Sequence, residues 1–231
     1  MTWQKITLVS LLATVVGIIV LEALGLLFMY LSVGRFKDDW EKRIQQPGEF
    51  VYVALGDSAA QGVGATSAER SYVGIIAKRI SQKTGKSVRI VNISQSGAKI
   101  QDAIQNQVPR IQRYKPDLVT VEIGANDIAS FNDAKFKADF TKLSKLLPAD
   151  TYVSNMPYFG SRSARRPYAF EASKIIEQTL SKDTRLKLVD LQSITQQRES
   201  KLNYAPDYFH PNNRAYNNWA DAFWKEIEGN L

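Results

Sequence analysis

Residues 6–33 form a run of about 28 residues that is apolar throughout, except for Glu22 and a few small polar side chains. A helix needs only about 20 such residues to cross the hydrocarbon core of a bilayer, whereas the apolar region of a cleaved signal peptide has about 7–15. The run is hydrophobic all round rather than along one stripe, which disfavours a helix packed on a globular core. We therefore expect an uncleaved single-pass anchor over residues 1–35, with a long signal peptide as the alternative.

Two features of this segment bear on its position in a membrane. A carboxylate such as Glu22 costs on the order of 3 kcal/mol at mid-bilayer. We interpret it as tolerated by the apolar side chains around it, with a polar contact to a partner helix as the alternative. Lys5 precedes the run and a cluster of Lys and Arg follows it at positions 35–43. By the positive-inside rule, this distribution puts the rest of the chain in the cytoplasm.

The remainder of the chain has the size and composition of one globular domain. We expect residues 36–48, which are charged and end in Pro-Gly, to form a juxtamembrane linker, and residues 49–231 to form the domain. The net charge of +7 favours anionic surfaces, but no basic tract with interleaved aromatic residues is present, so nucleic acid is not an expected partner. The chain has no cysteine and one histidine, so disulfides, thiolate metal sites and His-rich metal sites are excluded, and no cofactor is expected.

Strand-like and helix-like stretches alternate from residue 49 onward, joined by short connections. Apolar, β-branched runs predict strands at 49–56, 87–94, 117–124, 151–157 and 185–192. Apolar residues at helical spacing predict helices at 72–85, 100–114 (interrupted near Pro109), 136–148, 173–183 and 212–229. This alternation predicts a three-layer α/β/α fold with a central parallel sheet of about five strands, preceded by one transmembrane helix. Ligands of such sheets bind at the carboxyl ends of the strands.

Three of those expected strand ends carry polar motifs. Gly56-Asp57-Ser58 ends the first strand, and a serine at a strand-to-helix turn can project its hydroxyl into the cleft. The second strand is followed by Gly97, whose N–H group can face an oxyanion, and the third by Asn126, whose amide can donate to the same oxyanion. Each motif taken alone is a weak signal, and an N-cap, a turn glycine or an Asx turn is then the favoured explanation.

The segment APDYFHPNN at 205–213 contains the single histidine, His210, three residues after Asp207. A carboxylate so close in the chain can hydrogen-bond the imidazole, fix its tautomer and leave Nε2 free to take a proton from a serine. A lone histidine packed beneath the last helix is the alternative. The three strand-end motifs favour the catalytic interpretation.

Taken together, the four motifs resemble those of the SGNH hydrolases, the GDSL esterase/lipase family. GDSAAQGVGA, NISQSGA, VEIGAND and DYFHPN are similar to the family's four blocks, and the resemblance runs from about Val51 to Ala220. It implies a flavodoxin-like fold, with Ser58 as nucleophile, His210 as general base and Asp207 as the residue that orients it. It also implies an oxyanion hole formed by Ser58, Gly97 and Asn126. Arg214 departs from the small residue or glycine that many members carry after this last motif.

The resemblance implies a membrane-anchored serine esterase or lipase. The alternatives are an O-acyltransferase or deacetylase acting on envelope polysaccharide, and a catalytically silent binding domain. A basic, aromatic loop at 158–170 carries Arg162, Arg165 and Arg166 as candidate contacts to an anionic substrate, although charged loops are also commonly just solvated. The expected substrate is an ester of a lipid or an acylated glycan. That substrate favours an extracytoplasmic domain, against the charge distribution around the anchor.

Overall fold

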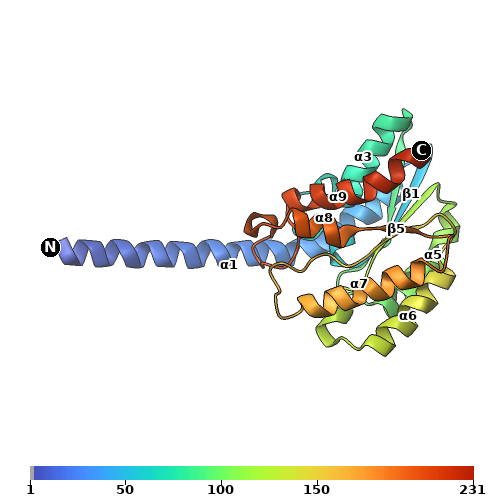
Figure 1. The fold of residues 1–231 in the computed structure, drawn as a ribbon. Coiled ribbons are helices and arrows are strands. Elements are labelled where there is room, and N and C mark those ends of the chain that lie inside the picture. Colours follow the sequence, from blue (N-terminus) through green and yellow to red (C-terminus); the bar gives the residue numbers. More distant parts are fainter. Residues whose placement is uncertain (1–2) are drawn as a thin grey trace.

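The computed structural model describes residues 3–231, so the first two residues of the expected anchor lie outside the described part (Figure 1). Five strands form one sheet in the order β2-β1-β3-β4-β5, and every neighbouring pair is parallel. The strands are β1 Phe50–Gly56, β2 Val88–Asn92, β3 Leu118–Glu122, β4 Tyr152–Ser154 and β5 Lys187–Val189. The predicted fold is confirmed, and the strand order is that of flavodoxin-like sheets, in which the order of strand addition across the sheet switches sides between β1 and β3.

Helices cover both faces of this sheet. The principal helices of the domain are α2 Ser58–Gln61, α3 Tyr72–Thr84, α6 Asp133–Leu146, α7 Arg166–Leu180, α8 Leu191–Gln197 and α9 Asn213–Ile227. One apolar cluster joins the sheet to α3 and α9, and a second joins the other face to α6, α7 and residues 100–111. Because both faces are covered, the strands are apolar almost throughout, and four side chains of β1, residues 52–55, are fully buried.

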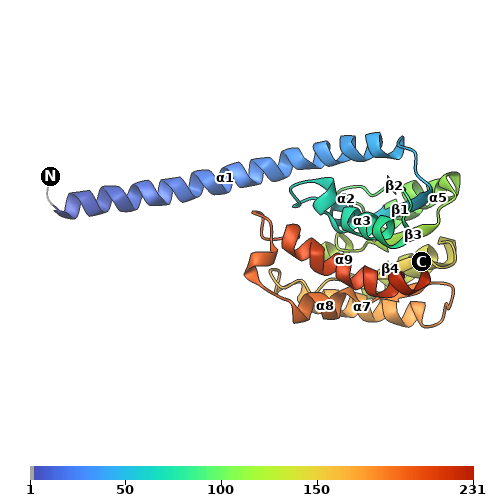
Figure 2. The same cartoon turned by 90° about the horizontal axis from the view of Figure 1, so that it is seen from above.

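The N-terminal helix α1, Trp3–Ile44, is continuous through the described part of the expected anchor and most of the expected linker. Its first part projects away from the domain, and its last part lies along the β2 edge of the sheet (Figures 1 and 2). Phe36, Trp40 and Ile44 recur at four-residue spacing on one side of the helix and are buried against the domain. The helix therefore covers the exposed edge of β2 as well as extending beyond the domain.

Two of the expected local structures are wrong in detail. The loop expected at 158–170 ends early, because α7 begins at Arg166 with Pro167 in its first turn, where proline is favoured. The helix expected over 100–114 consists of short segments: α4 Ile100–Asp102, a π-helical turn at Ala103–Gln107 and α5 Val108–Ile111. Pro109 lacks the N–H group that a regular helix needs and clashes with the preceding turn, so the irregularity falls just before it.

Candidate active site

The turn between β1 and α2 holds Ser58 at the carboxyl end of the sheet. Gly56 has φ +150°, and a Cβ added there would lie 2.1 Å from the carbonyl oxygen of Glu122, so only glycine fits. Asp57 caps α2 by accepting a hydrogen bond from the Ala59 N–H group at 3.0 Å. Ser58 is therefore the first residue of α2, and its own N–H group has no partner within that helix.

The segment 205–211, which we call the histidine loop, is folded around the carboxylate of Asp207. One carboxylate oxygen accepts hydrogen bonds from the N–H groups of Phe209 and His210, each at 3.0 Å. The other oxygen lies 2.5 Å from Nδ1 of His210. Burial alone would raise the pKa of Asp207, but the hydrogen bonds from the imidazole and the two N–H groups outweigh it and hold the pKa below its ordinary value. Asp207 is therefore ionised at neutral pH.

The histidine loop brings its imidazole to Ser58, 152 residues earlier in the chain. Nε2 of His210 lies 2.9 Å from Oγ of Ser58. This approach depends on Gly64, at φ +97°, where an added Cβ would lie 2.3 Å from the carbonyl oxygen of Pro211. Ser58, His210 and Asp207 thus form one continuous hydrogen-bonded series.

The two other expected oxyanion donors lie in the loops after β2 and β3. The amide nitrogen of Asn126 donates to the carbonyl oxygen of Ala98 at 3.0 Å and to the carboxylate of Asp57 at 3.2 Å. Gly97 has φ +80° and is exposed, and within residues 3–231 its N–H group donates no hydrogen bond. The Asn126 amide is thus held beside the Ser58 turn by two acceptors, while the Gly97 N–H group is available to a ligand.

A pocket opens beside Ser58 and His210. Its lining combines the Ser58 turn, Asn126, the histidine loop and the segments around Phe159 and Tyr204. Arg162 lines the pocket, with its guanidinium 5.3 Å from the centre of the Phe209 ring. The other two arginines do not line it. Arg165 is exposed, and Arg166 donates to the carbonyl oxygen of Gly160 at 2.8 Å.

Two acidic residues that line the Ser58 pocket, Asp57 and Glu122, have no catalytic role that the sequence predicts. Burial raises the pKa of Asp57 to about 6, although the Ala59 N–H group and His210 oppose the shift. Glu122, at the end of β3, is fully buried, and neither of its carboxyl oxygens has a hydrogen-bond partner within residues 3–231. Burial, with Asp57 nearby, raises the pKa of Glu122 well above its usual range, which favours the neutral form of this carboxyl group. A glutamate between two apolar residues, Val121 and Ile123, was the available signal.

A serine, a histidine and an aspartate hydrogen-bonded in series at the carboxyl end of a parallel sheet are the arrangement of the Ser-His-Asp hydrolases. The chain belongs to the GDSL-like lipase/acylhydrolase family, whose model matches residues 54–217. That range includes both ends of the series, from Ser58 to His210, and both loops that carry the expected oxyanion donors.

Individual relatives agree with this family membership. A GDSL-like esterase of Mycobacterium tuberculosis is 29% identical over 127 residues, a match that covers 52% of this chain and 40% of the relative. A lipase/acylhydrolase from Enterococcus faecalis has a similar structure, with a TM-score of 0.66 and 21% identity over 79% of this chain and 97% of its own. A variant of an acetyl xylan esterase from Geobacillus stearothermophilus has a TM-score of 0.61 and 21% identity over 78% and 94%. At these identities the two structures establish the shared fold.

Proposed function

We propose that this protein is a membrane-anchored serine ester hydrolase. Ser58 is its nucleophile, His210 its general base and Asp207 the residue that orients the base. The observation that carries the proposal is the pair of contacts made by His210, at 2.9 Å to Ser58 Oγ and at 2.5 Å to Asp207. Both distances are within reach of proton transfer or of a strong charge-assisted hydrogen bond.

The reaction begins with attack of Ser58 Oγ on the carbonyl carbon of an ester. Nε2 of His210 takes the hydroxyl proton as the C–O bond forms, and the Asp207 carboxylate stabilises the resulting imidazolium. The oxyanion accepts hydrogen bonds from the N–H groups of Ser58 and Gly97 and from the amide of Asn126. To reach it, the Asn126 amide exchanges its hydrogen bond to Asp57 for one to the oxyanion.

The second half of the reaction repeats these roles with water. His210 returns its proton to the leaving alcohol, which departs and leaves an acyl group on Ser58. A water molecule then attacks this acyl-enzyme while His210 takes one of its protons. Collapse of the second tetrahedral intermediate releases the acid and restores the Ser58 hydroxyl.

The proposal also covers the membrane anchor, which is helix α1, and the kind of ester that the pocket binds. Helix α1 is long and apolar enough to cross a membrane, with a mean hydropathy of 2.5 in its most apolar window and none of that window buried. Arg162 at the pocket wall favours an anionic ester, carried by a lipid or an acylated glycan. Esters of this kind in a cell envelope would place the domain on the extracytoplasmic side.

The test is ester hydrolysis by the full chain in detergent. We expect Ser58→Ala or His210→Ala to abolish turnover of p-nitrophenyl acetate, because each removes a reacting group. A fluorophosphonate reagent is expected to label the wild type and Ser163→Ala, a control at an exposed serine, but not Ser58→Ala. Full activity or undiminished labelling of Ser58→Ala would refute the proposed nucleophile.

A second candidate, an O-acyltransferase, uses the same residues with a sugar hydroxyl in place of water. The observation that favours an acyltransferase is that the Ser58 pocket is open to solvent beside Arg162. An acceptor sugar needs such room beside the acyl-enzyme. Release of free acid from p-nitrophenyl acetate, compared with and without acceptor sugar, separates the two. Hydrolysis that is unaffected by the sugar favours the esterase.

A further inference from the structure

Helix α1 and the sheet run in opposite directions. At the end of α1, the carbonyl oxygen of Ile44 accepts a hydrogen bond from the guanidinium of Arg89, in the first half of β2, at 2.8 Å. One turn earlier in α1, the indole N–H of Trp40 donates at 2.8 Å to the carbonyl oxygen of Gln61, which lies beyond the end of β1. The carboxyl ends of the strands therefore point back toward the N-terminal part of α1.

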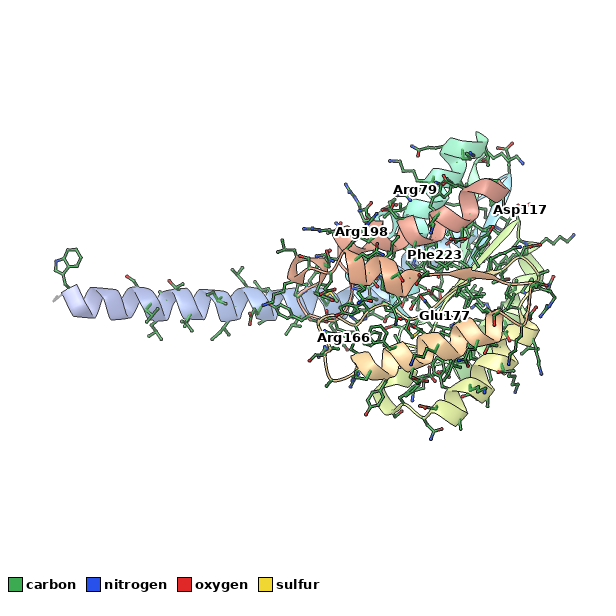
Figure 3. All side chains as sticks on the ribbon, viewed as in Figure 1. Arg79, Asp117, Arg166, Glu177, Arg198 and Phe223 are labelled. Atoms are coloured by element: carbon green, nitrogen blue, oxygen red, sulfur yellow. The ribbon has the colours of Figure 1, made fainter. Side chains whose placement is uncertain are left out.

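The histidine loop packs on α1 itself. Met29 is buried together with Val63 and Ala205. A Cβ added at Gly25 would lie 2.8 Å from Cβ of Pro206, so the helix backbone and the loop are in close approach. Figure 3 agrees with this orientation, since Arg166 lies at the end of the domain from which α1 projects, and Asp117, just before β3, lies at the opposite end. The active site thus flanks the last apolar turns of α1.

This docking defines how much of α1 is free to cross a membrane. The apolar run begins at residue 6 and the domain begins to contact it at Gly25, which leaves about 19 residues, or roughly 28 Å of helix. The hydrocarbon core of a bilayer is about 30 Å thick. The span therefore ends where the active site begins. Glu22 then lies near the lipid headgroups rather than at mid-bilayer, which removes most of the cost expected for its charge.

The side chains exposed around the pocket mouth are also suited to a position at the bilayer surface. Leu202 is 69% exposed and Tyr208 is 62% exposed, and both lie in segments next to the histidine. Arg162 and Arg165 are exposed on the neighbouring loop. Apolar and aromatic side chains beside arginines are the composition of surfaces that rest on anionic bilayers.

We propose that the catalytic end of the domain rests on the surface of the bilayer that α1 spans, and that the pocket takes ester substrates held in that bilayer. Leu202 and Tyr208 enter the interface, and Arg162 and Arg165 contact anionic headgroups. The inference rests on the proposed function and narrows its substrate to membrane lipids that carry an acyl ester. A polysaccharide substrate would instead require a pocket mouth that faces water.

The experiment uses the full chain in vesicles of phosphatidylcholine with phosphatidylglycerol. It compares p-nitrophenyl palmitate, dissolved in the bilayer, with water-soluble p-nitrophenyl acetate. The test variant is Leu202→Ser, at an exposed side chain outside the histidine loop. The matched control is Leu146→Ser, at an exposed leucine that ends α6 at the opposite end of the domain.

We expect Leu202→Ser to lose roughly tenfold or more of its turnover of the palmitate, since burial of one apolar side chain is worth about a decade in binding. Its turnover of the acetate stays within about twofold of wild type, as does that of Leu146→Ser on both esters. Equal turnover of the palmitate by Leu202→Ser and wild type would overturn the docking proposal while leaving the esterase intact. Equal losses on both esters would overturn it as well, because Leu202 would then affect the reaction independently of the bilayer.

The charged part of the surface has its own test. Arg165→Gln is expected to reduce the stimulation of palmitate hydrolysis by phosphatidylglycerol by about fivefold, the effect of one basic residue near a charged surface. Lys182→Gln, an exposed control just beyond the end of α7, leaves that stimulation unchanged. Stimulation that is identical in Arg165→Gln and wild type, or hydrolysis of acetylated glycan but not of palmitate, contradicts the proposal. Wild type that is inactive on both p-nitrophenyl esters would instead count against the proposed function.

Discussion

Two carboxyl groups near Ser58 have opposite environments. Asp207 lies in a partly exposed loop, where an imidazole and two N–H groups donate to it. Glu122 lies in the interior at the end of β3, and no group within residues 3–231 donates to it. Hydrogen bonding lowers the pKa of the first, and burial raises the pKa of the second. The balance between burial and hydrogen-bond donors, rather than proximity to the nucleophile, therefore decides which acid is charged.

This difference assigns the two acids different tasks. A charged Asp207 can stabilise an imidazolium, which a neutral acid cannot do. A neutral Glu122 can be kept inside the domain without a partner cation, because its proton removes the cost of burying a charge. Replacement of each acid by its own amide changes the charge with little change in shape, and so separates these tasks.

The largest effect is expected for Asp207→Asn. An amide at this position presents an N–H group to Nδ1 of His210, favours the wrong tautomer and leaves the imidazolium without a counter-charge. We expect kcat for p-nitrophenyl acetate to fall by about 10³–10⁴, with KM little changed. The measurement is steady-state kinetics of the full chain at neutral pH. A loss of less than about tenfold would mean that Asp207 is not the residue that orients His210.

An intermediate effect is expected for Asn126→Ala. This variant extends the comparison to a third acid near Ser58, Asp57, because the Asn126 amide donates a hydrogen bond to it. The variant removes one oxyanion donor, and kcat should fall by about 10²–10³. The unfolding temperature of the variant should stay close to that of wild type, since the Asn126 side chain is only partly buried. An unchanged kcat would exclude Asn126 from the oxyanion hole.

The smallest effect on activity is expected for Glu122→Gln, with kcat within about threefold of wild type. Its effect on stability depends on pH. The folded-state pKa of Glu122 is raised, so its contribution to stability is fully present below the unfolded pKa of about 4.3 and is lost as pH rises toward the folded value. Glutamine does not titrate, so the difference in Tm, variant minus wild type, should grow between pH 5 and pH 8 by at least about 2 °C.

Two outcomes would contradict the assignment of a charged Asp207 and a neutral Glu122. Equal losses of kcat in Asp207→Asn and Glu122→Gln would show that charge is not what distinguishes them. A difference in Tm that is constant from pH 5 to pH 8 would show that Glu122 is ionised in the folded protein, contrary to its burial. Thermal unfolding of both variants in the same detergent serves as the common control.

Much of the architecture followed from patterns within short stretches of sequence. Five apolar runs predicted the strands, and the turn residues that follow them predicted where the chemistry would lie. Helix α7 begins earlier than predicted. The charges of Arg165 and Arg166 are typical of a solvated loop, but Pro167 is favoured in the first turn of a helix. The sequence predicts no role for Glu122, because periodicity does not reveal which buried polar group lacks a partner.

The relation between α1 and the active site is a further result that local patterns do not contain. An apolar run predicts a span, but Gly25 and Pro206 are 181 positions apart, and nothing in either segment indicates that they touch. Likewise, the sequence placed an aspartate near the histidine in the chain, but the approach of His210 to Ser58 depends on the close packing at Gly64.

Local patterns in the chain are enough to predict the apolar span, the alternation typical of a parallel α/β/α sheet, and residue types suited to ester hydrolysis. These depend on periodicity, backbone preference and the chemistry of single side chains, all of which are local. Folding sets the distance from His210 to Ser58, the raised pKa of Glu122 and the side of the domain that faces the anchor. Each of these depends on which distant segments exclude water from a group or donate hydrogen bonds to it.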